Sequence, residues 1–398
     1  MSSSTFILSD GRFLVGGKFE TCSVKVVNGI ISEIARSIPS KKGERVLQLD
    51  GMTVLPGLIN AHDHLEFNLF KRIGKPPYPN YVVWGEDIHQ HHQAYIQEVL
   101  RVPLRLRLLW GAYKNIFSGV TTVVHHNKHY HHFRFGFPVG VYGKYSWIHS
   151  LALDKELDRK LQSMNGRPCI IHLAEGTDAI AEAELAKLHA LGGLRPNTVI
   201  VHGIALSPMD IDVIAETGAS LVWCPSSNDF LFHRTAPLKT ALGRIRIALG
   251  TDSTLTGRQG LLDEIRCAMR SNVVDASSIL NMVTSVPAAI FGMNSGAIEP
   301  GMDADFLLIG SAESNPYETF LNLDAGSIRC LVRKGVPLYG DSSTVEAFTI
   351  PGRSYTKLRV SGKNKMVRGN LVRLIKRIHQ QLPSFDLNGL PIEFGRAT

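Results

Sequence analysis

Histidine and carboxylate side chains recur at the ends of apolar segments in this sequence. His62 and His64 follow the segment TVLPGLI and are two residues apart. Because side chains alternate between the faces of a strand, both imidazoles point the same way while Asp63 points to the opposite face. Two imidazoles that converge at the carboxyl end of a strand suit a divalent metal ion. An isolated pair of this kind is more often packing or surface, so its partners decide its meaning.

Three further segments end in groups that bind metals or move protons. The segment RPCIIHLAE carries His172 and Glu175, NTVIVHG carries His202, and IRIALGTD carries Asp252. In a barrel of parallel strands, the carboxyl ends of all strands share one face, where active sites are built. The sequence therefore predicts that these side chains meet at one mouth and form a metal and acid–base site.

The elements that must position these groups alternate between strand-like and helix-like patterns. Seven or eight such units over about 230 residues predict an α/β fold, a (β/α)8 TIM-type barrel. The segment between Val124 and His172 is short for two complete units. Either one helix is missing there or one connection is very short. The strand candidates are TVLPGLI, GVTTVVHH, PVGVYGKY, RPCIIHLAE, NTVIVHGI, ASLVWCP and IRIALGTD.

Both ends of the chain have the short alternating patterns of β-strands. Asp10-Gly11 and Asn28-Gly29 are hairpin signals, and similar strands return in GAIEPGMDADFLLIG and SIRCLVRKGVPLYGD. We expect a small β-sandwich domain from residues 1–56 and 292–349, a hydrolase barrel over 57–291, and a basic C-terminal extension over 350–398. The segment LVRLIKRIHQQL (371–382) predicts an amphipathic helix that docks on its own barrel or on another subunit.

The combination of motifs resembles the amidohydrolase superfamily of metal-dependent barrel hydrolases. The matching elements are PGLINAHDHL, the strand ends at His172 and His202, LGTDST, and the closing GAIEPGMDADFLL. The HLAE segment and VWCPSSNDF resemble the aminohydrolase branch, which includes cytosine, guanine and adenosylhomocysteine deaminases. Binuclear members use a carboxylated lysine on the fourth strand. No lysine occupies a convincing strand end there, which indicates one metal ion.

The resemblance implies a role for each of these residues. Three imidazoles and one carboxylate suit Zn²⁺, with Fe²⁺ as the alternative. The ion would bring the pKa of a bound water toward about 7. Glu175 would then shuttle a proton to the substrate, His202 would polarise the reacting group, and Asp252 would take up the proton of the water. The implied metal ligands are His62, His64, His172 and Asp252.

Contacts to the substrate are predicted less directly. The segment 66–88 is rich in Pro and aromatic residues, and long structured loops over an active site often bind substrate. Trp84 would stack on a planar ring; the alternative is that it packs the loop down. His125 follows the second strand and Asn228 follows the seventh, so both are candidates to contact substrate, with loop packing as the alternative for His125.

The predicted function is hydrolysis of a non-peptide carbon–nitrogen bond, as hydrolytic deamination of an amino-substituted heterocycle by metal-bound hydroxide. Two alternatives stay open. The same site would serve hydrolysis of a cyclic amide, as in imidazolonepropionase. A barrel without activity that acts as a binding module is the alternative from a different class.

Composition limits the partners and the compartment. The chain has 398 residues, 44% hydrophobic, without a run of apolar residues long enough to span a membrane. Five scattered cysteines without CxxC spacing favour a reducing, cytoplasmic location. The formal net charge of +8 lies wholly in residues 351–398, and residues 1–350 are neutral. We expect a small-molecule substrate, no nucleic acid, no membrane partner, and a homodimer as the family-level oligomer.

Overall fold

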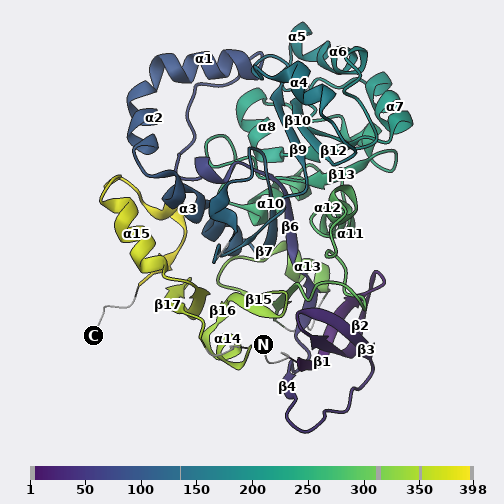
Figure 1. Ribbon diagram of the computed structural model, residues 1–398, viewed down its shortest axis with the longest axis vertical. Helices are drawn as coiled ribbons and strands as arrows, with labels where there is room; N and C mark the ends of the chain where they lie inside the picture. Colours follow the sequence, from purple (N-terminus) through teal and green to yellow (C-terminus); the bar gives the residue numbers. More distant parts are fainter. Residues whose placement is uncertain (1–4, 135, 311–314, 349–351, 395–398) are drawn as a thin grey trace.

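The computed structural model describes residues 5–134, 136–310, 315–348 and 352–394. Figure 1 shows a barrel made from the middle of the chain and, beside it, a β-rich unit to which both ends of the chain contribute. The predicted fold class, a TIM-type barrel with a β-sandwich domain from both chain ends, is confirmed. The predicted boundaries at 56/57 and 291/292 remain a prediction.

Eight short parallel strands of the described chain surround the barrel axis. They pair as a three-stranded group and a five-stranded group. The ring closes between its first and last strands, where the amide of Thr251 donates to the carbonyl oxygen of His62 at 2.8 Å. Asp63 and Asp252 also form a parallel bridge there. The strands are β6 Leu58–Asp63, β7 Val120–His125, β8 Gly140–Val141, β9 Ser146–Ser150, β10 Cys169–Leu173, β11 Thr198–His202, β12 Ser220–Trp223 and β13 Arg246–Leu249.

The short segment between Val124 and His172 holds two strands. β8 has two residues, and only residues 142–145 separate it from β9, with no helix between them. Both predicted explanations therefore apply, since a helix is absent and the connection is very short. The strand at 146–150 was missed because its sequence, SWIHS, lacks a run of apolar residues.

Helices follow most of the barrel strands and cover the outside of the ring. Helix α7 shows why they begin and end where they do. It starts with a reciprocal capping box between Ser207 and Asp210, has Pro208 in its first turn, and stops at Gly218 with φ 76°. The helices around the barrel are α3 Leu104–Ile116, α4 Leu157–Gln162, α5 Ala179–Glu182, α6 Glu184–Ala190, α7 Pro208–Thr217, α8 Pro225–Phe232, α9 Leu238–Ala241, α10 Leu261–Arg270, α11 Ala276–Met282 and α12 Ser285–Phe291.

The inside of the barrel is a separate small core of short and β-branched side chains. Ala61, Val124, Ile170, Val201 and Ala248 lie in this cluster and are almost completely buried. Each comes from a different strand, so the cluster shows which side of each of these five strands faces inward. The first turns after these strands then carry polar side chains into the mouth above this core.

The connection from β6 to β7 is long, and its first part forms a cover over the mouth of the barrel. After a single turn of 3-10 helix, η1 (Leu65–Phe67), the chain runs to α1 (Tyr81–His91) and α2 (Gln93–Leu100). Asn80 caps α1 by accepting hydrogen bonds from the amides of Val82 and Val83. Because α1 starts at a fixed cap, its first turn is held over the barrel.

The β-rich unit is one large sheet with strands from the beginning and the end of the chain. The segment TVLPGLI divides between two sheets, since β5 belongs here and β6 to the barrel. Gly57 lies at this division, where a Cβ would come within 2.4 Å of Thr121. The strands run in the order β19, β17, β18, β16, β15, β14, β5, β1, β2, β3, with β4 beside β1. Their bounds are β1 Thr5–Val15, β2 Lys18–Val27, β3 Ile30–Ala35, β4 Arg45–Gln48, β5 Thr53–Pro56, β14 Phe306–Ile309, β15 Ile328–Arg333, β16 Val336–Asp341, β17 Tyr355–Val360, β18 Lys363–Arg368 and β19 Ile392–Glu393.

The basic C-terminal segment differs from the expected helical extension. β17 and β18 extend the large sheet, and helix α15 (Leu371–His379) occupies only part of the segment. The apolar face of α15 is buried beside α3, and Phe385 packs edge-on against Trp110 with ring centroids 4.8 Å apart. The segment thus docks on its own barrel. The remaining helical elements are α13 Pro316–Leu321, α14 Ser342–Phe348, η2 His131–Phe133 and η3 Leu387–Gly389.

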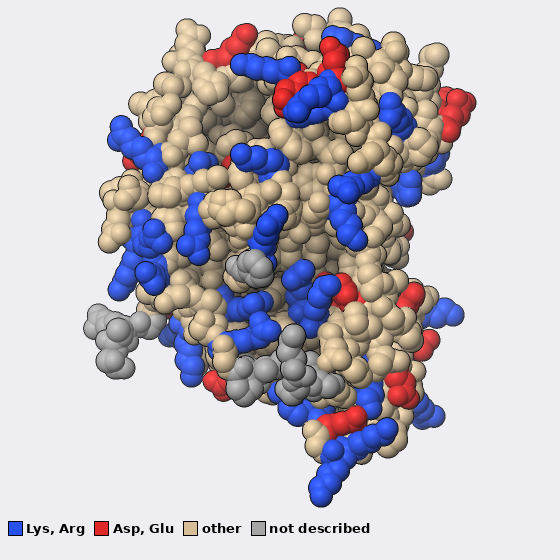
Figure 2. Space-filling model, in the orientation of Figure 1, with Lys and Arg blue, Asp and Glu red and all other residues tan. Residues whose placement is uncertain are grey.

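Figure 2 shows Lys and Arg side chains gathered on this face over α15 and the neighbouring strands, as the charge count predicts.

Among the described residues, no helix is both long enough and apolar enough to cross a membrane.

Candidate metal centre

The predicted ligands lie at the carboxyl ends of three barrel strands. His62 is in β6 and His64 follows that strand, His172 is in β10, and Asp252 comes after β13. Gly250 allows β13 to approach β6, because a Cβ there would lie 2.6 Å from the Cβ of His62. The close approach of these two strands brings Asp252 beside the histidine pair.

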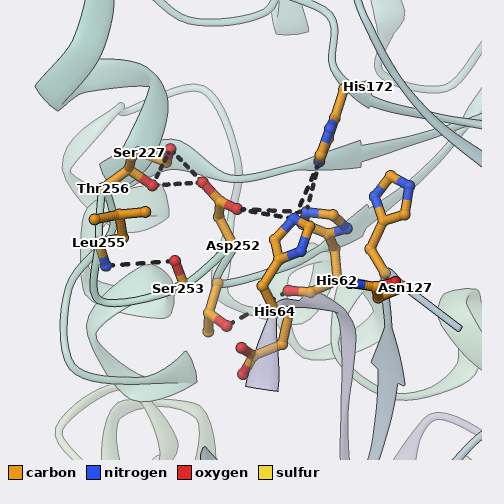
Figure 3. Close-up of polar contacts among 12 residues, drawn as sticks. His62, His64, Asn127, His172, Ser227, Asp252, Ser253, Leu255 and Thr256 are labelled. Atoms are coloured by element: carbon orange, nitrogen blue, oxygen red, sulfur yellow. Dashed lines mark hydrogen bonds and ion pairs between the residues drawn. The ribbon is translucent and has the colours of Figure 1, made fainter. Parts of the chain in front are cut away.

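The four side chains converge on one point (Figure 3). The Nε2 atom of His172 lies 3.3 Å from Nε2 of His62 and 3.3 Å from Nε2 of His64. Asp252 Oδ1 lies 3.6 Å from Nε2 of each histidine of the pair. Bonds of about 2.0–2.1 Å to a tetrahedral zinc ion place ligand atoms about 3.4 Å apart. The donor types and their spacing fit one divalent ion.

Burial keeps the imidazoles of His62 and His172 neutral, which is the form that binds a metal. His62 is fully buried, and this burial lowers its pKa to about 4. Burial also holds the pKa of His172 well below its usual range, and the neighbouring histidines add to the effect. At neutral pH these two imidazoles therefore carry no extra proton that an ion must displace.

Asp252 is held as a carboxylate by its surroundings. Burial acts to raise its pKa, but the hydrogen bond with His62 and the nearby histidines outweigh burial, so that the pKa is lowered. Its second oxygen, Oδ2, accepts hydrogen bonds from Ser227, at 2.8 Å, and from Thr256. These bonds leave Oδ1 directed at the histidines, as Figure 3 shows.

Glu175 and His202 lie beside the ligands and face each other. Glu175 Oε1 is 3.6 Å from His202 Nε2. Burial, followed by the negative charges of Asp252 and Glu184, holds the pKa of Glu175 well above its usual range. The Nδ1 atom of His202 lies 2.8 Å from Oδ1 of Asn228, which is an acceptor, so Nδ1 carries the hydrogen and Nε2 is free to accept. The site thus combines a carboxyl group whose pKa is raised with an imidazole whose Nε2 is free to accept a hydrogen bond.

Some of the strained backbone positions of the described chain lie at this site. Ala174, His202 and Asp252 are non-glycine residues with φ of 53°, 73° and 59°. Left-handed conformations of such residues cost on the order of 1–3 kcal/mol and persist where surrounding structure fixes them. Each of the three lies in or directly beside a predicted catalytic residue, which supports a functional reading of this mouth.

A pocket of about 250 Å³ opens above the ligands. Its walls include His64, His172, Glu175, His202 and Asp252. Figure 2 shows a hollow beside α1, the helix that contributes to its rim. Aromatic and apolar side chains supply much of the remaining lining: Phe67, Tyr81, Trp84, Ile88, Leu153 and Leu255. A larger cavity of about 610 Å³ lies next to residues 70–72 and 386–389, but none of the converging ligands lines it.

The predicted substrate contacts lie in three different places. Trp84 lines the pocket, and its indole Nε1 donates to the carbonyl oxygen of Ile73, which fixes the ring. Asn228 is outside the pocket lining and contacts His202 Nδ1 at 2.8 Å, so it is placed to orient that ring. His125 is also outside the lining; it is buried with its Nδ1 3.6 Å from Glu66.

The neighbouring His126 reaches the ligand cluster instead, and His149 lines the pocket. Strand alternation from Val124, which faces the barrel interior, places His126 inward and His125 outward. Side-chain alternation along this strand is the feature of the sequence that could have identified His126 as the inward-facing residue. His149 was missed together with its strand β9.

The fold and the site define a metal-dependent hydrolase barrel, and comparison with known proteins adds the family that it resembles. Residues 154–338 match the sequence profile of the amidohydrolase family, as the motifs predict. It is 25% identical to a 5-methylthioadenosine/S-adenosylhomocysteine deaminase of Pyrococcus furiosus, over 76% of this chain and 86% of that protein. It is 21% identical to a 5'-deoxyadenosine deaminase of Methanothermobacter thermautotrophicus, over 78% of this chain and 86% of that protein.

A solved structure also has this fold. An adenosine deaminase from Xanthomonas campestris, with bound zinc, superimposes with a TM-score of 0.71 and 17% identity. The superposition covers 96% of this chain and 98% of that one.

Proposed function

We propose that this protein is a metal-dependent deaminase that hydrolyses the exocyclic C–N bond of an aminopurine nucleoside. Water replaces the amino group, so that the products are the oxo-purine and ammonia. The observation that carries this proposal is Glu175, a buried carboxyl group whose pKa is held well above its usual range, with Oε1 3.6 Å from Nε2 of His202 and beside the ligand cluster. Deamination needs such a group, because the amine leaves only after it gains a proton.

Each residue then has a separate task. A bound divalent ion supplies a water that ionises near neutral pH. His62, His64, His172 and Asp252 would hold this ion, and Asp252 takes up the proton of the water at its carboxylate. Glu175 delivers its proton to the purine ring nitrogen and regains one from the hydroxyl group that adds to the ring, while the proton taken up by Asp252 passes to the amino group, which leaves as ammonia.

His202 and Trp84 position the substrate. His202 offers Nε2 as an acceptor to the reacting group, since Asn228 holds its Nδ1 hydrogen. Trp84 presents its ring from α1, where it can stack on the purine. The cover thus orients the base while the barrel supplies the acid and the ligands.

Zinc is the metal we propose. Three imidazole nitrogens and one carboxylate oxygen are donors intermediate between hard and soft, which suits zinc. The structurally similar adenosine deaminase has bound zinc. We further propose a cytoplasmic location and a small-molecule substrate. The five cysteines are unpaired, as in a reducing compartment. The homodimer stays a prediction.

The test is ammonia release from zinc-loaded protein with 5'-deoxyadenosine, 5-methylthioadenosine and adenosine. We expect turnover of at least one nucleoside, with the matching oxo-purine as product. A ring-opened acid formed from a cyclic amide, without ammonia, would replace this proposal with the imidazolonepropionase-like alternative.

Two controls test whether the protein is a metal-dependent enzyme. Removal of the metal with a chelator should abolish turnover, and added zinc should restore it. Glu175→Gln should bind zinc with unchanged affinity and lose turnover, because the amide has no acidic proton to deliver. A purified protein without turnover that never binds zinc would favour the binding-module alternative.

A further inference from the structure

We propose that His126 is an additional metal ligand that coordinates through Nδ1. This inference rests on the proposed metal site but is independent of the identity of the substrate. His126 follows the second barrel strand, β7, whereas the predicted ligands come from the first, fifth and last strands.

The tautomer of His126 is fixed by a hydrogen bond. Its Nε2 lies 3.0 Å from the carbonyl oxygen of Ile148, which only accepts, so Nε2 carries the hydrogen. The lone pair is therefore on Nδ1. Histidines that bind metals commonly donate the other ring N–H to a backbone carbonyl in this way, which fixes both ring orientation and tautomer.

The Nδ1 atom has no partner of its own. It is a buried nitrogen without a hydrogen bond, in a residue that is 2% exposed. A buried acceptor left unpaired costs free energy on the order of 1–3 kcal/mol. A metal ion at the cluster would satisfy it.

The position of the ring matches that of the other ligands. Ring centroids lie 4.3 Å from His172, 5.0 Å from His62 and 5.4 Å from His64. The centroids of those three histidines are 5.0 to 5.3 Å from one another. One ring nitrogen of each of the four histidines lies within 4.8 Å of those of the others. His126 thus borders the predicted ligands, among which Nε2 of His172 lies 3.3 Å from Nε2 of His62 and of His64.

The experiment compares variants that remove one ring nitrogen at a time. Glutamine places its amide near the Nε2 position, so His126→Gln can still donate to Ile148 but offers nothing at the Nδ1 position. His126→Asn instead keeps a polar atom near that position. The control is His125→Gln, since His125 is equally buried but faces Glu66. Zinc affinity is measured by competition with a chromophoric chelator, and the Co²⁺-loaded forms are compared by visible absorption.

We expect His126→Gln to weaken zinc binding at least about tenfold and to change the Co²⁺ spectrum, while His126→Asn loses less and the control matches the wild type. Unchanged affinity and spectrum in His126→Gln would overturn the inference, as would an equal loss in His126→Gln and the control. A crystal structure of the zinc-loaded wild type tests it without a variant. We expect a Zn–Nδ1 bond of about 2.0–2.1 Å, and a separation without a bond refutes it. If the wild type binds no metal, the proposed function itself fails.

Discussion

The hydroxyl of Tyr81 donates a hydrogen bond of 3.0 Å to the carboxylate of Glu184, and this contact joins the cover to the catalytic turn. The other carboxylate oxygen of Glu184 accepts from the amide of Ala174 at 2.7 Å. Ala174 precedes Glu175 and has a left-handed conformation. The amide of Tyr81 also donates to the carbonyl oxygen of Glu175 at 3.2 Å. The start of α1 and the position of the proposed acid are therefore fixed by the same contacts.

Replacing Tyr81 by Phe should damage catalysis more than folding. The variant leaves one oxygen of a buried carboxylate without its donor, at a cost of about 1–3 kcal/mol. We expect kcat to fall about tenfold, because the turn that carries Glu175 loses a restraint. Tyr113→Phe is the matched control, since its hydroxyl bonds the carbonyl oxygen of Arg368 outside the pocket. Steady-state kinetics and thermal unfolding of both variants give the answer, and equal kcat in the two would contradict it.

Lys114→Met should weaken zinc binding as well as stability. Lys114 Nζ lies 3.1 Å from Asp63 Oδ2, with both side chains almost fully buried. Because Asp63 lies between His62 and His64, loss of its cation disturbs both ligands. We expect a loss of about 3–5 kcal/mol in the free energy of unfolding and about 10–100-fold in zinc affinity.

A second buried pair supplies the control for Lys114. Lys365 Nζ is 2.6 Å from Asp341 Oδ1 in the large sheet, remote from the metal site. Lys365→Met should lose stability but keep its zinc affinity. If zinc competition gives the same affinity for Lys114→Met and the wild type, the pair has no role at the metal centre.

Glu264 should make stability fall as pH rises through neutrality. Burial raises its pKa from 4.5 to about 7, although Ser226 donates to both of its oxygens. A pKa raised on folding means that the native state holds the proton more tightly. The contribution is complete below about pH 4.5 and is lost as pH rises through about 7. The total is on the order of 3 kcal/mol.

Urea unfolding of metal-free protein at several pH values measures this effect. Glu264→Gln should reduce the dependence between pH 5 and 8, because its amide can still bond Ser226 but does not ionise. Glu299→Gln, at an exposed position, should retain the wild-type dependence. Parallel curves for Glu264→Gln and the wild type would rule out this titration.

If the protein is a nucleoside deaminase, neutral 5'-substituents should be preferred over charged ones. The described residues that line the pocket include no Lys or Arg. The homocysteine part of S-adenosylhomocysteine carries a carboxylate and an ammonium group, which lose solvation there without a partner. We expect its kcat/KM to be at least about tenfold below that of 5-methylthioadenosine.

A cation placed at the rim should reverse part of this preference. Leu153 lines the pocket and is 48% exposed, so Leu153→Arg would set a guanidinium at the mouth. Leu153→Met is the control of similar size. Equal kcat/KM for the two nucleosides in the wild type would show that the amino-acid part is accommodated in another way.

The sequence alone predicted the positions of site residues where a histidine or a carboxylate follows a run of apolar residues. His62, His64, His172 and Asp252 each follow such a run, so the mouth could be predicted before its geometry. The same reasoning failed at His125, because a pair of adjacent histidines reveals its inward member only when the phase of the strand is known. It failed again at β17 and β18, whose many charged residues resemble a solvated tail although they complete an edge of the sheet. Pairing of distant strands is a tertiary effect that local pattern does not show.

The end of the described chain has a consequence for the order in which the site is assembled. The side-chain amide of Asn388 donates to the carbonyl oxygen of Asn68 at 2.7 Å, across 320 positions of sequence, and it lies 3.4 Å from Thr254 Oγ1. Asn68 and Thr254 belong to the two loops that follow His64 and Asp252. Contacts between such distant positions carry a high loop-closure entropy and form late in folding. During synthesis, all the side chains proposed to bind the metal are therefore made long before Asn388, whose contacts hold the loops that follow His64 and Asp252.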